Sequence, residues 1–204
     1  GRVFVTATPE RLASCDGRSI SCDAVAGTIR RSAIEQNDLE LGKSLLADPK
    51  ARHEHRLVVE DISHSLQPLC ASLDIREFPT LKRLRNLQHL WTEIQGQLKP
   101  GVSLLQAATA IHPTAAVNGH PGVEAATWLR QNEPFARGWY AGVAGWIDCS
   151  GRGELAVLLR CALLDDDRAD LFAGAGITAG SDADDEFAET ELKFGVMLEA
   201  LENS

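Results

Sequence analysis

The sequence predicts an α+β fold in which mixed, largely antiparallel sheets pack against helices. Two polar turns, over residues 15–18 and 150–153, separate pairs of apolar segments, which is typical of β-hairpins. Helical patterns stand between the hairpins and do not alternate one to one with strands, so parallel βαβ units are not expected. The 204 residues are enough for one domain with a substantial core.

The chain begins in a β-rich segment. Residues 2–8 carry apolar side chains at alternate positions and are expected to form a strand. A hairpin partner is expected over residues 19–24. It leads to Gly27 and Thr28, where a glycine followed by a hydroxyl residue at a strand end can expose backbone N–H groups to a ligand. A simple turn is the alternative interpretation.

Two helices are expected next, over residues 37–47 and 49–73. In the second helix an apolar stripe at helical spacing starts at Val58, and a step of four residues back from Val58 reaches Glu54. A carboxylate on the stripe that faces the core needs a cation, a metal ion or a group of hydrogen-bond donors. This pattern alone leaves an arginine partner and a metal ion as equal alternatives.

The middle of the chain is expected to form short strands over residues 75–79 and 87–93, around a basic turn at residues 82–85. His89 lies in the second of these strands. A lone histidine in a strand is more often structural than catalytic. Further helices are expected over residues 104–111 and 122–133, each ended by a proline.

The apolar segments 138–148 and 154–164 are expected to pair as strands. Arg160 lies inside the second segment, and a buried guanidinium there needs an anion from the protein or from a ligand. A third strand is expected to open at Leu171, and a helix follows it to the end of the chain.

That last helix is acidic and follows a glycine-rich turn over residues 174–180. Glu186, Glu189 and Lys193 are spaced i, i+3, i+7 and therefore share one helical face. Two carboxylates and an ammonium, beside backbone amides freed by glycines, can hold a divalent cation next to a carboxylate ligand. A solvated acidic surface with ion pairs inside the helix is the alternative, and the spacing alone favours that alternative.

Composition restricts the partners. The formal net charge of −9 argues against nucleic acid or an anionic membrane, and no apolar run approaches the length of a membrane span. The five cysteines are odd in number and show no C-x2-C spacing, so free thiols in a reducing cytosol are expected. The chain starts at a glycine inside an expected strand, so we expect the natural N-terminus and any targeting sequence to be missing. The expected location is cytoplasmic, with a plastid left open, and the expected state is a monomer.

Nine short segments carry the most specific signal. They are residues 8–12 (TPERL), 26–28 (AGT), 50–55 (KARHEH), 88–90 (QHL), 112–114 (HPT) with Gly119 and Pro121, 137–142 (RGWYAG), Arg160, 174–176 (GAG) and 186–193 (EFAETELK). In this order and with these gaps, they resemble the chorismate-utilising enzymes, and specifically the isochorismate synthases. Each segment alone is a weak signal, but together they cover nearly the whole chain.

The family acts with Mg²⁺ on chorismate, a small dicarboxylate. The resemblance implies that Glu54 and Glu189 are carboxylates around the ion, with Glu186 close by or acting through water. Mg²⁺ suits such a set, because it is a hard cation that takes carboxylate oxygens and keeps waters. Arg160 and Tyr140 would receive the carboxylate of the enolpyruvyl arm, for which a guanidinium fork is a natural donor.

The resemblance also implies the rest of the substrate site. Backbone amides and an ammonium group would complete an anion cradle, and two further side chains would contact the substrate. These residues are Gly27, Thr28, Gly174, Ala175, Gly176 and Lys193 for the cradle, with His89 and Thr114 as the further contacts.

In isochorismate synthases water attacks ring position 2 and the 4-hydroxyl leaves. The resemblance implies that Glu10 is the general acid that protonates this hydroxyl, so we expect partial burial to raise its pKa. The family's general base is a lysine on an upstream strand, and no residue here matches it. Residues 1–204 are therefore expected to be the C-terminal portion of a chorismate-binding catalytic domain.

The choice of activity within the superfamily depends on fewer residues. Enzymes of this superfamily that use ammonia typically carry a Pro-Ala-Gly-Thr segment followed by Gly-Ala-Pro-Lys. Here the sequence reads HPT over residues 112–114, and Gly122 stands in place of that lysine. Salicylate synthase, anthranilate synthase component I and an inactive chorismate-binding fragment remain alternatives. The pathway that the product feeds, whether to menaquinone, phylloquinone or a siderophore, stays open.

Overall fold

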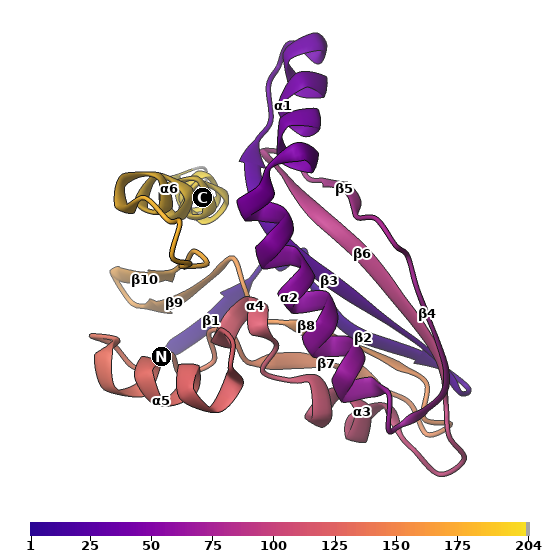
Figure 1. Cartoon of the computed structure of the whole chain (residues 1–204). Helices are drawn as coiled ribbons and strands as arrows, with labels where there is room; N and C mark the ends of the chain where they lie inside the picture. The colour runs from indigo at the N-terminus through magenta and orange to yellow at the C-terminus, as the bar shows by residue number, and fades with distance from the viewer. Residues whose placement is uncertain (203–204) are drawn as a thin grey trace.

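The structure is a computed structural model that describes residues 1–202, and it confirms the predicted α+β class (Figure 1). The strands are β1 (Arg2–Thr6), β2 (Arg11–Asp16), β3 (Ser19–Arg30), β4 (Cys70–Ile75), β5 (Thr80–Arg83), β6 (Leu87–Leu98), β7 (Val143–Ile147), β8 (Gly153–Val157), β9 (Cys161–Asp165) and β10 (Arg168–Phe172). The helices are α1 (Glu35–Ala47), α2 (Pro49–Leu66), α3 (Leu104–Ile111), α4 (Ala115–Asn118), α5 (Gly122–Asn132) and α6 (Ala183–Glu202).

The strands form two antiparallel sheets. The larger sheet has the order β4-β6-β3-β2-β8-β7, and β5 pairs with β6 on the same edge as β4. The smaller sheet has the order β1-β9-β10. Helix α2 lies across the larger sheet, and the main core fills the space between this sheet, α2 and α3 (Figure 1). The largest side chains of this core are Leu12, Ile20, Ile62, Leu66, Ile94, Leu98, Leu104 and Ile111.

The two sheets are joined at one corner, where the chain crosses between them twice. One crossing is the link from β1 to β2, and the other is the link from β8 to β9. The N–H of Ala7 donates to the carbonyl of Arg160 at 2.9 Å, and the N–H of Val157 donates to the carbonyl of Glu10 at 3.0 Å. These bonds hold Glu10 and Arg160 beside each other, although they are far apart in sequence.

The prediction of a single strand over residues 154–164 is wrong. Strand β8 ends at Val157 and β9 begins at Cys161 in the other sheet, with Arg160 in the bend at a φ of 48°. Both strands contribute buried residues, so apart from Arg160 the apolar run continues through the bend. Periodicity alone does not reveal such a change of sheet.

The predicted helix over residues 49–73 begins correctly but is too long. Asp48 caps α2 by accepting hydrogen bonds from the N–H groups of Lys50 and Ala51. The helix ends at Leu66, because Pro68 has no N–H group with which to continue it. The strand predicted over residues 75–79 is therefore displaced to β4, and the first half of the predicted basic turn belongs to β5.

The other predicted elements are present, but several strand bounds differ. The strand predicted over residues 19–24 continues to Arg30, so Gly27 and Thr28 lie inside β3 and not at a strand end. The strand predicted over residues 87–93 continues to Leu98, the one predicted over 138–148 is reduced to β7, and the one predicted to open at Leu171 is β10, which begins at Arg168.

The two hairpins form as β2–β3 and β7–β8, and α3 and α5 lie where the helical patterns placed them. All five cysteines are free thiols, as the odd number and the spacing predicted. Within residues 1–202, no helix combines the length and the apolar character that crossing a membrane requires.

Gly27 is the extra residue of a β-bulge in β3, next to α2. Its φ is +75°, and a Cβ atom there would lie 3.0 Å from the Cβ of Ala51. We therefore expect Gly27→Ala to lower the free energy of unfolding by about 1 to 3 kcal/mol, since the substitution combines a left-handed conformation with a close contact. Urea denaturation of the complete protein measures this change.

Gly17→Ala is the matched control for the bulge. Gly17 also has a positive φ, +64°, but a Cβ there would meet no atom within 4 Å. Gly27→Ala should therefore cost more than Gly17→Ala. Equal losses would show that the contact with α2 contributes nothing.

Candidate active site

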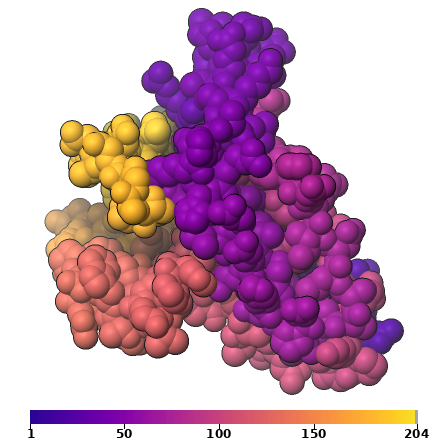
Figure 2. All heavy atoms as spheres, in the orientation of Figure 1, coloured from indigo at the N-terminus to yellow at the C-terminus, as the bar shows by residue number. Residues whose placement is uncertain are grey.

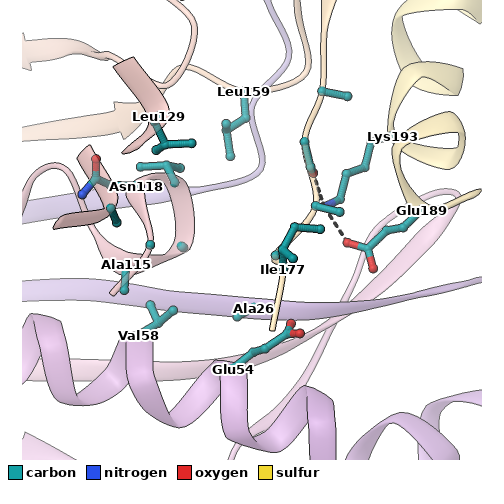
Figure 3. Close-up of a pocket in the computed structure, with 18 of the residues that line it drawn as sticks. Ala26, Glu54, Val58, Ala115, Asn118, Leu129, Leu159, Ile177, Glu189 and Lys193 are labelled. Atoms are coloured by element: carbon teal, nitrogen blue, oxygen red, sulfur yellow. Dashed lines mark hydrogen bonds and ion pairs between the residues drawn. The ribbon is translucent and has the colours of Figure 1, made fainter. Parts of the chain in front are cut away.

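A cavity of about 900 Å³ opens beside the corner where the two sheets meet. It is enclosed by β3, α2, the loop after β10 and the helices α4, α5 and α6 (Figure 3). In Figure 2 the yellow α6 and the salmon α5 form two separate lobes beside the purple α2. Most of the predicted site residues line this cavity: Glu10, Gly27, Thr28, Glu54, His89, Tyr140, Arg160, Gly174, Ala175, Gly176, Glu189 and Lys193.

Thr114 and Glu186 are predicted site residues that do not line the cavity. Thr114 is buried just before α4, and its hydroxyl finds no hydrogen-bond partner within the described part of the chain. Its neighbour Ala115 does reach the cavity. Glu186 is buried at the start of α6, where it forms an ion pair with Lys50 of α2. A contact between Thr114 and substrate therefore stays a prediction.

Glu10 is the acidic group at the corner. Only 7% of its surface is exposed, and burial raises its pKa to about 7, although the positive charges of Lys82 and Arg160 act in the opposite direction. A substantial share of Glu10 is therefore protonated near neutral pH. This agrees with the raised pKa that a general acid requires.

Lys82 is a neighbour of this site that the sequence analysis missed. Its ammonium donates to a carboxylate oxygen of Asp23 at 2.9 Å, and Arg11 donates to the other oxygen at 2.8 Å. Lys82 was placed in a turn, but it lies in β5 directly opposite His89 of β6. Pairing the segment around Lys82 with the strand that carries His89 would have placed Lys82 beside the site.

Glu54 projects from the first turns of α2 into the cavity (Figure 3). Burial raises its pKa to about 7, and the nearby negative charges of Glu186 and Glu189 act in the same direction. Its Oε1 is buried and has no hydrogen-bond partner among the described residues, while the Nζ of Lys50 lies 3.8 Å away. The arginine partner that the sequence left open is not found among the described residues; the nearest positive charge is the Lys50 ammonium, and a metal ion as the partner stays a prediction.

The remaining charges of this part of the cavity come from α6. The ammonium of Lys193 donates to the carbonyl of Gly174 at 2.7 Å and lies 2.6 Å from the carboxylate of Glu189 (Figure 3). The first contact ties the glycine loop to the helix, and the second lies within α6. A Cβ atom at Gly176 would lie 3.4 Å from the carboxylate of Glu54, so the same loop runs directly past that group.

The carboxylates suit a divalent cation in their chemistry. Over residues 1–202, no three His, Cys, Asp or Glu side chains converge closely enough to hold a metal ion as they stand. Glu54 and Glu186 instead face the same lysine ammonium, and Glu189 faces Lys193. The unpartnered Oε1 of Glu54 nevertheless provides a buried oxygen ligand of the kind that Mg²⁺ takes.

The opposite side of the cavity is built to receive an anion. Arg160 is buried, and burial lowers its pKa while the charges of Glu10 and Glu189 raise it. Its Nε has no partner within the described residues. Tyr140 lies nearby in the cavity wall, stacked on Phe172 with ring centroids 5.5 Å apart.

His89 is a neutral polar group in this wall. Its Nδ1 lies 3.1 Å from the hydroxyl of Thr28, and its buried Nε2 has no partner among the described residues. Burial lowers its pKa to about 3, so the ring carries no charge at neutral pH. It is therefore suited to hydrogen bonding with a ligand and unsuited to binding one by charge.

Known proteins with similar sequences share nearly the whole length of this chain. The profile of a family described as "Chorismate binding enzyme" matches residues 1–202. The salicylate biosynthesis isochorismate synthase of Pseudomonas aeruginosa is 44% identical over 198 residues, which are 97% of this chain and 42% of that protein. Isochorismate synthase MenF of Bacillus subtilis is 39% identical over 201 residues, which are 98% of this chain and 43% of that protein. The chain thus spans about half the length of the curated relatives it matches.

Solved structures agree with the sequence comparison. DhbC from Bacillus anthracis superposes with a TM-score of 0.95 at 39% identity, over 100% of this chain and 55% of that one. Anthranilate synthase component I from Streptococcus pneumoniae superposes with a TM-score of 0.82 at 28% identity, over 94% of this chain and 42% of that one. The family profile, the relatives and the shared fold together show that this chain belongs to the chorismate binding enzymes.

Proposed function

We propose that this chain carries the chorismate-binding and proton-donating part of an isochorismate synthase. The observation that carries the proposal is Glu10, a buried carboxyl with a pKa of about 7, which faces a cavity that also holds Arg160 and Lys193. Several of the most similar curated relatives are named isochorismate synthases, at 38–44% identity. The match to anthranilate synthase component I is lower, at 28%.

The cavity offers two separate places for the two carboxylates of chorismate. Arg160 and Tyr140 would receive the carboxylate of the enolpyruvyl arm on one side. The ring carboxylate would lie toward α6, near Lys193 and the backbone of the glycine loop. Glu54, Glu189 and Glu186 would hold Mg²⁺ there, and the bound ion would neutralise the ring carboxylate.

Glu10 would supply the proton of the reaction. A C–O bond forms between water and C2, the ring double bonds shift, and the C–O bond at C4 breaks. Glu10 gives its proton to the departing 4-hydroxyl, which leaves as water. A base takes the proton of the attacking water, and the family resemblance assigns that role to a lysine upstream of residue 1. Glu10 is then returned to its protonated form by solvent.

Arg160→Lys tests the site for the enolpyruvyl carboxylate. Lysine keeps the positive charge but loses the planar fork that can bind a carboxylate through two bonds. We expect the KM for chorismate to rise by roughly tenfold to a hundredfold, with a smaller change in kcat. Steady-state kinetics of the complete enzyme measures both constants.

Arg168→Lys is a suitable control, because Arg168 lies on β10 with 74% of its side chain exposed. It should leave the KM unchanged. A normal KM in Arg160→Lys would remove Arg160 from the substrate site.

Product analysis tests the proposed function as a whole. The gene product with its natural N-terminus would be incubated with chorismate and Mg²⁺, with and without ammonium, and the products separated and weighed by mass spectrometry. Isochorismate as the sole product, lost on chelation, is the expected result. Salicylate with pyruvate, or anthranilate formed with ammonium, would move the enzyme to a sister activity. No product at all would support binding without turnover.

A further inference from the structure

Helix α6 contacts the rest of the protein through both polar and apolar side chains. Only Glu186 and Met197 are buried among its described residues. Its contacts to other elements include the ion pair of Glu186 with Lys50 and the hydrogen bond of Lys193 with the loop carbonyl. In Figure 2 the helix stands out as a lobe against α2. The ion pair and the hydrogen bond therefore contribute to how α6 docks.

Lys50 lies at the centre of that junction. It is one helical turn before Glu54 on α2, and its ammonium forms an ion pair with Glu186 while lying 3.8 Å from the Oε1 of Glu54. It thus bridges two carboxylates that come from two different helices. Both carboxylates belong to the set proposed above to hold Mg²⁺.

The three side chains differ in their access to solvent. The exposed fractions are 34% for Lys50, 18% for Glu54 and 8% for Glu186. The lysine stem is long and flexible, so the ammonium can turn out into water at little cost. The two carboxylates have no such exit. If another cation replaces the ammonium between the two carboxylates, it is therefore the lysine side chain that must move.

We propose that Lys50 is a built-in counter-ion that exchanges with the divalent cation. Without the cation, its ammonium bridges Glu54 and Glu186 and docks α6 on α2. When the cation binds, the lysine turns outward and the cation takes over the bridge between the helices. This inference rests on the proposed function, because it uses the same carboxylates as the Mg²⁺ site.

Charge balance supports the exchange. The groups that face Lys50 are the carboxylates of Glu54, Glu186 and Glu189, and the ammonium of Lys193 is close to Glu189. A divalent cation between Glu54 and Glu186 would lie within a few ångströms of the Lys50 ammonium if the lysine stayed. Even at the dielectric constant of bulk water, repulsion at that distance weakens cation binding by roughly tenfold to a hundredfold.

The first test compares cation binding in the full-length protein and in its Lys50→Met variant. Binding of Mg²⁺ would be measured by titration calorimetry, and binding of Mn²⁺ by electron paramagnetic resonance. We expect Lys50→Met to bind both ions roughly tenfold more tightly, because the competing charge is gone. Its Tm in the presence of a chelator should be lower than that of the unmodified protein, and saturating Mg²⁺ should restore it.

Two further variants serve as controls, one for the positive charge at position 50 and one for the loss of a lysine elsewhere. Lys50→Arg keeps the positive charge and should bind the cations no more tightly than the unmodified protein. Lys43→Met removes an exposed lysine of α1 and should change neither the cation affinity nor the Tm. Equal or weaker cation binding by Lys50→Met would overturn the inference, and so would the absence of cation binding in the unmodified protein.

A second test uses the unmodified protein and does not depend on whether a variant folds. The rate at which an amine-reactive reagent labels Lys50 would be followed by peptide mass spectrometry. We expect saturating Mg²⁺ to increase this rate severalfold, because the ammonium leaves its carboxylate partners. A labelling rate that stays constant or falls would contradict the exchange.

Parallel product analysis distinguishes the two proposals. If the unmodified enzyme makes isochorismate and binds Mg²⁺, but Lys50 labels at the same rate with and without the ion, the exchange alone is wrong. If no isochorismate forms, the proposed function is wrong, whatever the cation does at Lys50.

Discussion

Glu10→Gln should nearly abolish isochorismate formation while leaving chorismate bound. Glutamine has a similar shape but no acidic proton to transfer to the leaving hydroxyl, so we expect kcat to fall by about 10²- to 10⁴-fold at neutral pH. The KM should change little, because Glu10 acts on the leaving group and not on a carboxylate of the substrate. Steady-state kinetics of the complete enzyme with saturating Mg²⁺ measures both constants.

The pH dependence provides an independent check on the same residue. A general acid works only when protonated, and burial raises the pKa of Glu10 to about 7. The rate that depends on this proton should therefore fall as the pH rises through about 7. In a plot of rate against pH, this alkaline fall should be absent from the residual activity of Glu10→Gln. An alkaline limb that survives unchanged in the variant would belong to another group.

The substitution Glu10→Gln should lower activity but raise stability at alkaline pH. Because the pKa of Glu10 is higher in the folded protein than its ordinary value of 4.5, the folded protein loses stability as the pH rises between these two values. At pH 8 the variant Glu10→Gln should be more stable than the unmodified protein by roughly 1 to 3 kcal/mol, and this advantage should vanish near pH 4.

Glu35→Gln is the matched control for these measurements, since Glu35 is exposed at the start of α1. It should alter neither the rate nor the stability. A Glu10→Gln variant that matches this control at pH 8 in urea denaturation would show that the carboxyl is not buried as described.

Glu54→Gln should remove Mg²⁺-dependent turnover while the fold stays intact. The amide keeps the size of the side chain but loses the negative charge that a hard cation requires. We expect turnover at millimolar Mg²⁺ to fall by about 10²-fold or more, in proportion to the loss of cation binding. Activity across a Mg²⁺ titration measures the effect, and circular dichroism reports on the fold.

Glu60→Gln provides the control on the same helix. Glu60 faces outward from α2, with 54% of its side chain exposed and a loose ion pair with Arg56. Rates and Mg²⁺ dependence should be unchanged there. Rates close to normal in Glu54→Gln would remove Glu54 from the metal site and leave its lysine contact as its only role.

The sequence was informative where a side chain conflicts with its apolar surroundings. Glu54 on a core-facing stripe and Arg160 in an apolar run each indicated a charge that needed a partner, and both line the cavity. Family resemblance then connected them to Glu10, which no periodicity singled out. These three residues come from distant parts of the chain, and each could be recognised from its own local pattern or motif.

Long-range geometry could not be predicted in the same way. The bend at Arg160 changes sheets without a break in the apolar pattern, so the corner that brings Arg160 to Glu10 was missed. The position of Lys50 between two helices was also missed, although its spacing of four residues from Glu54 placed both on one helical face. Its partner Glu186 is 136 residues away in sequence. Contacts of this kind depend on how elements dock, which local patterns do not encode.

In the proposed reaction, water adds at C2 of chorismate while the 4-hydroxyl leaves. The most direct measurement is the mass of the product formed by the complete enzyme with Mg²⁺ in ¹⁸O-labelled water. We expect isochorismate that carries the heavy oxygen at C2, with incorporation lost in Glu10→Gln and on chelation. Isochorismate without the label, or an aromatic product in its place, would show that the protein does not catalyse this reaction.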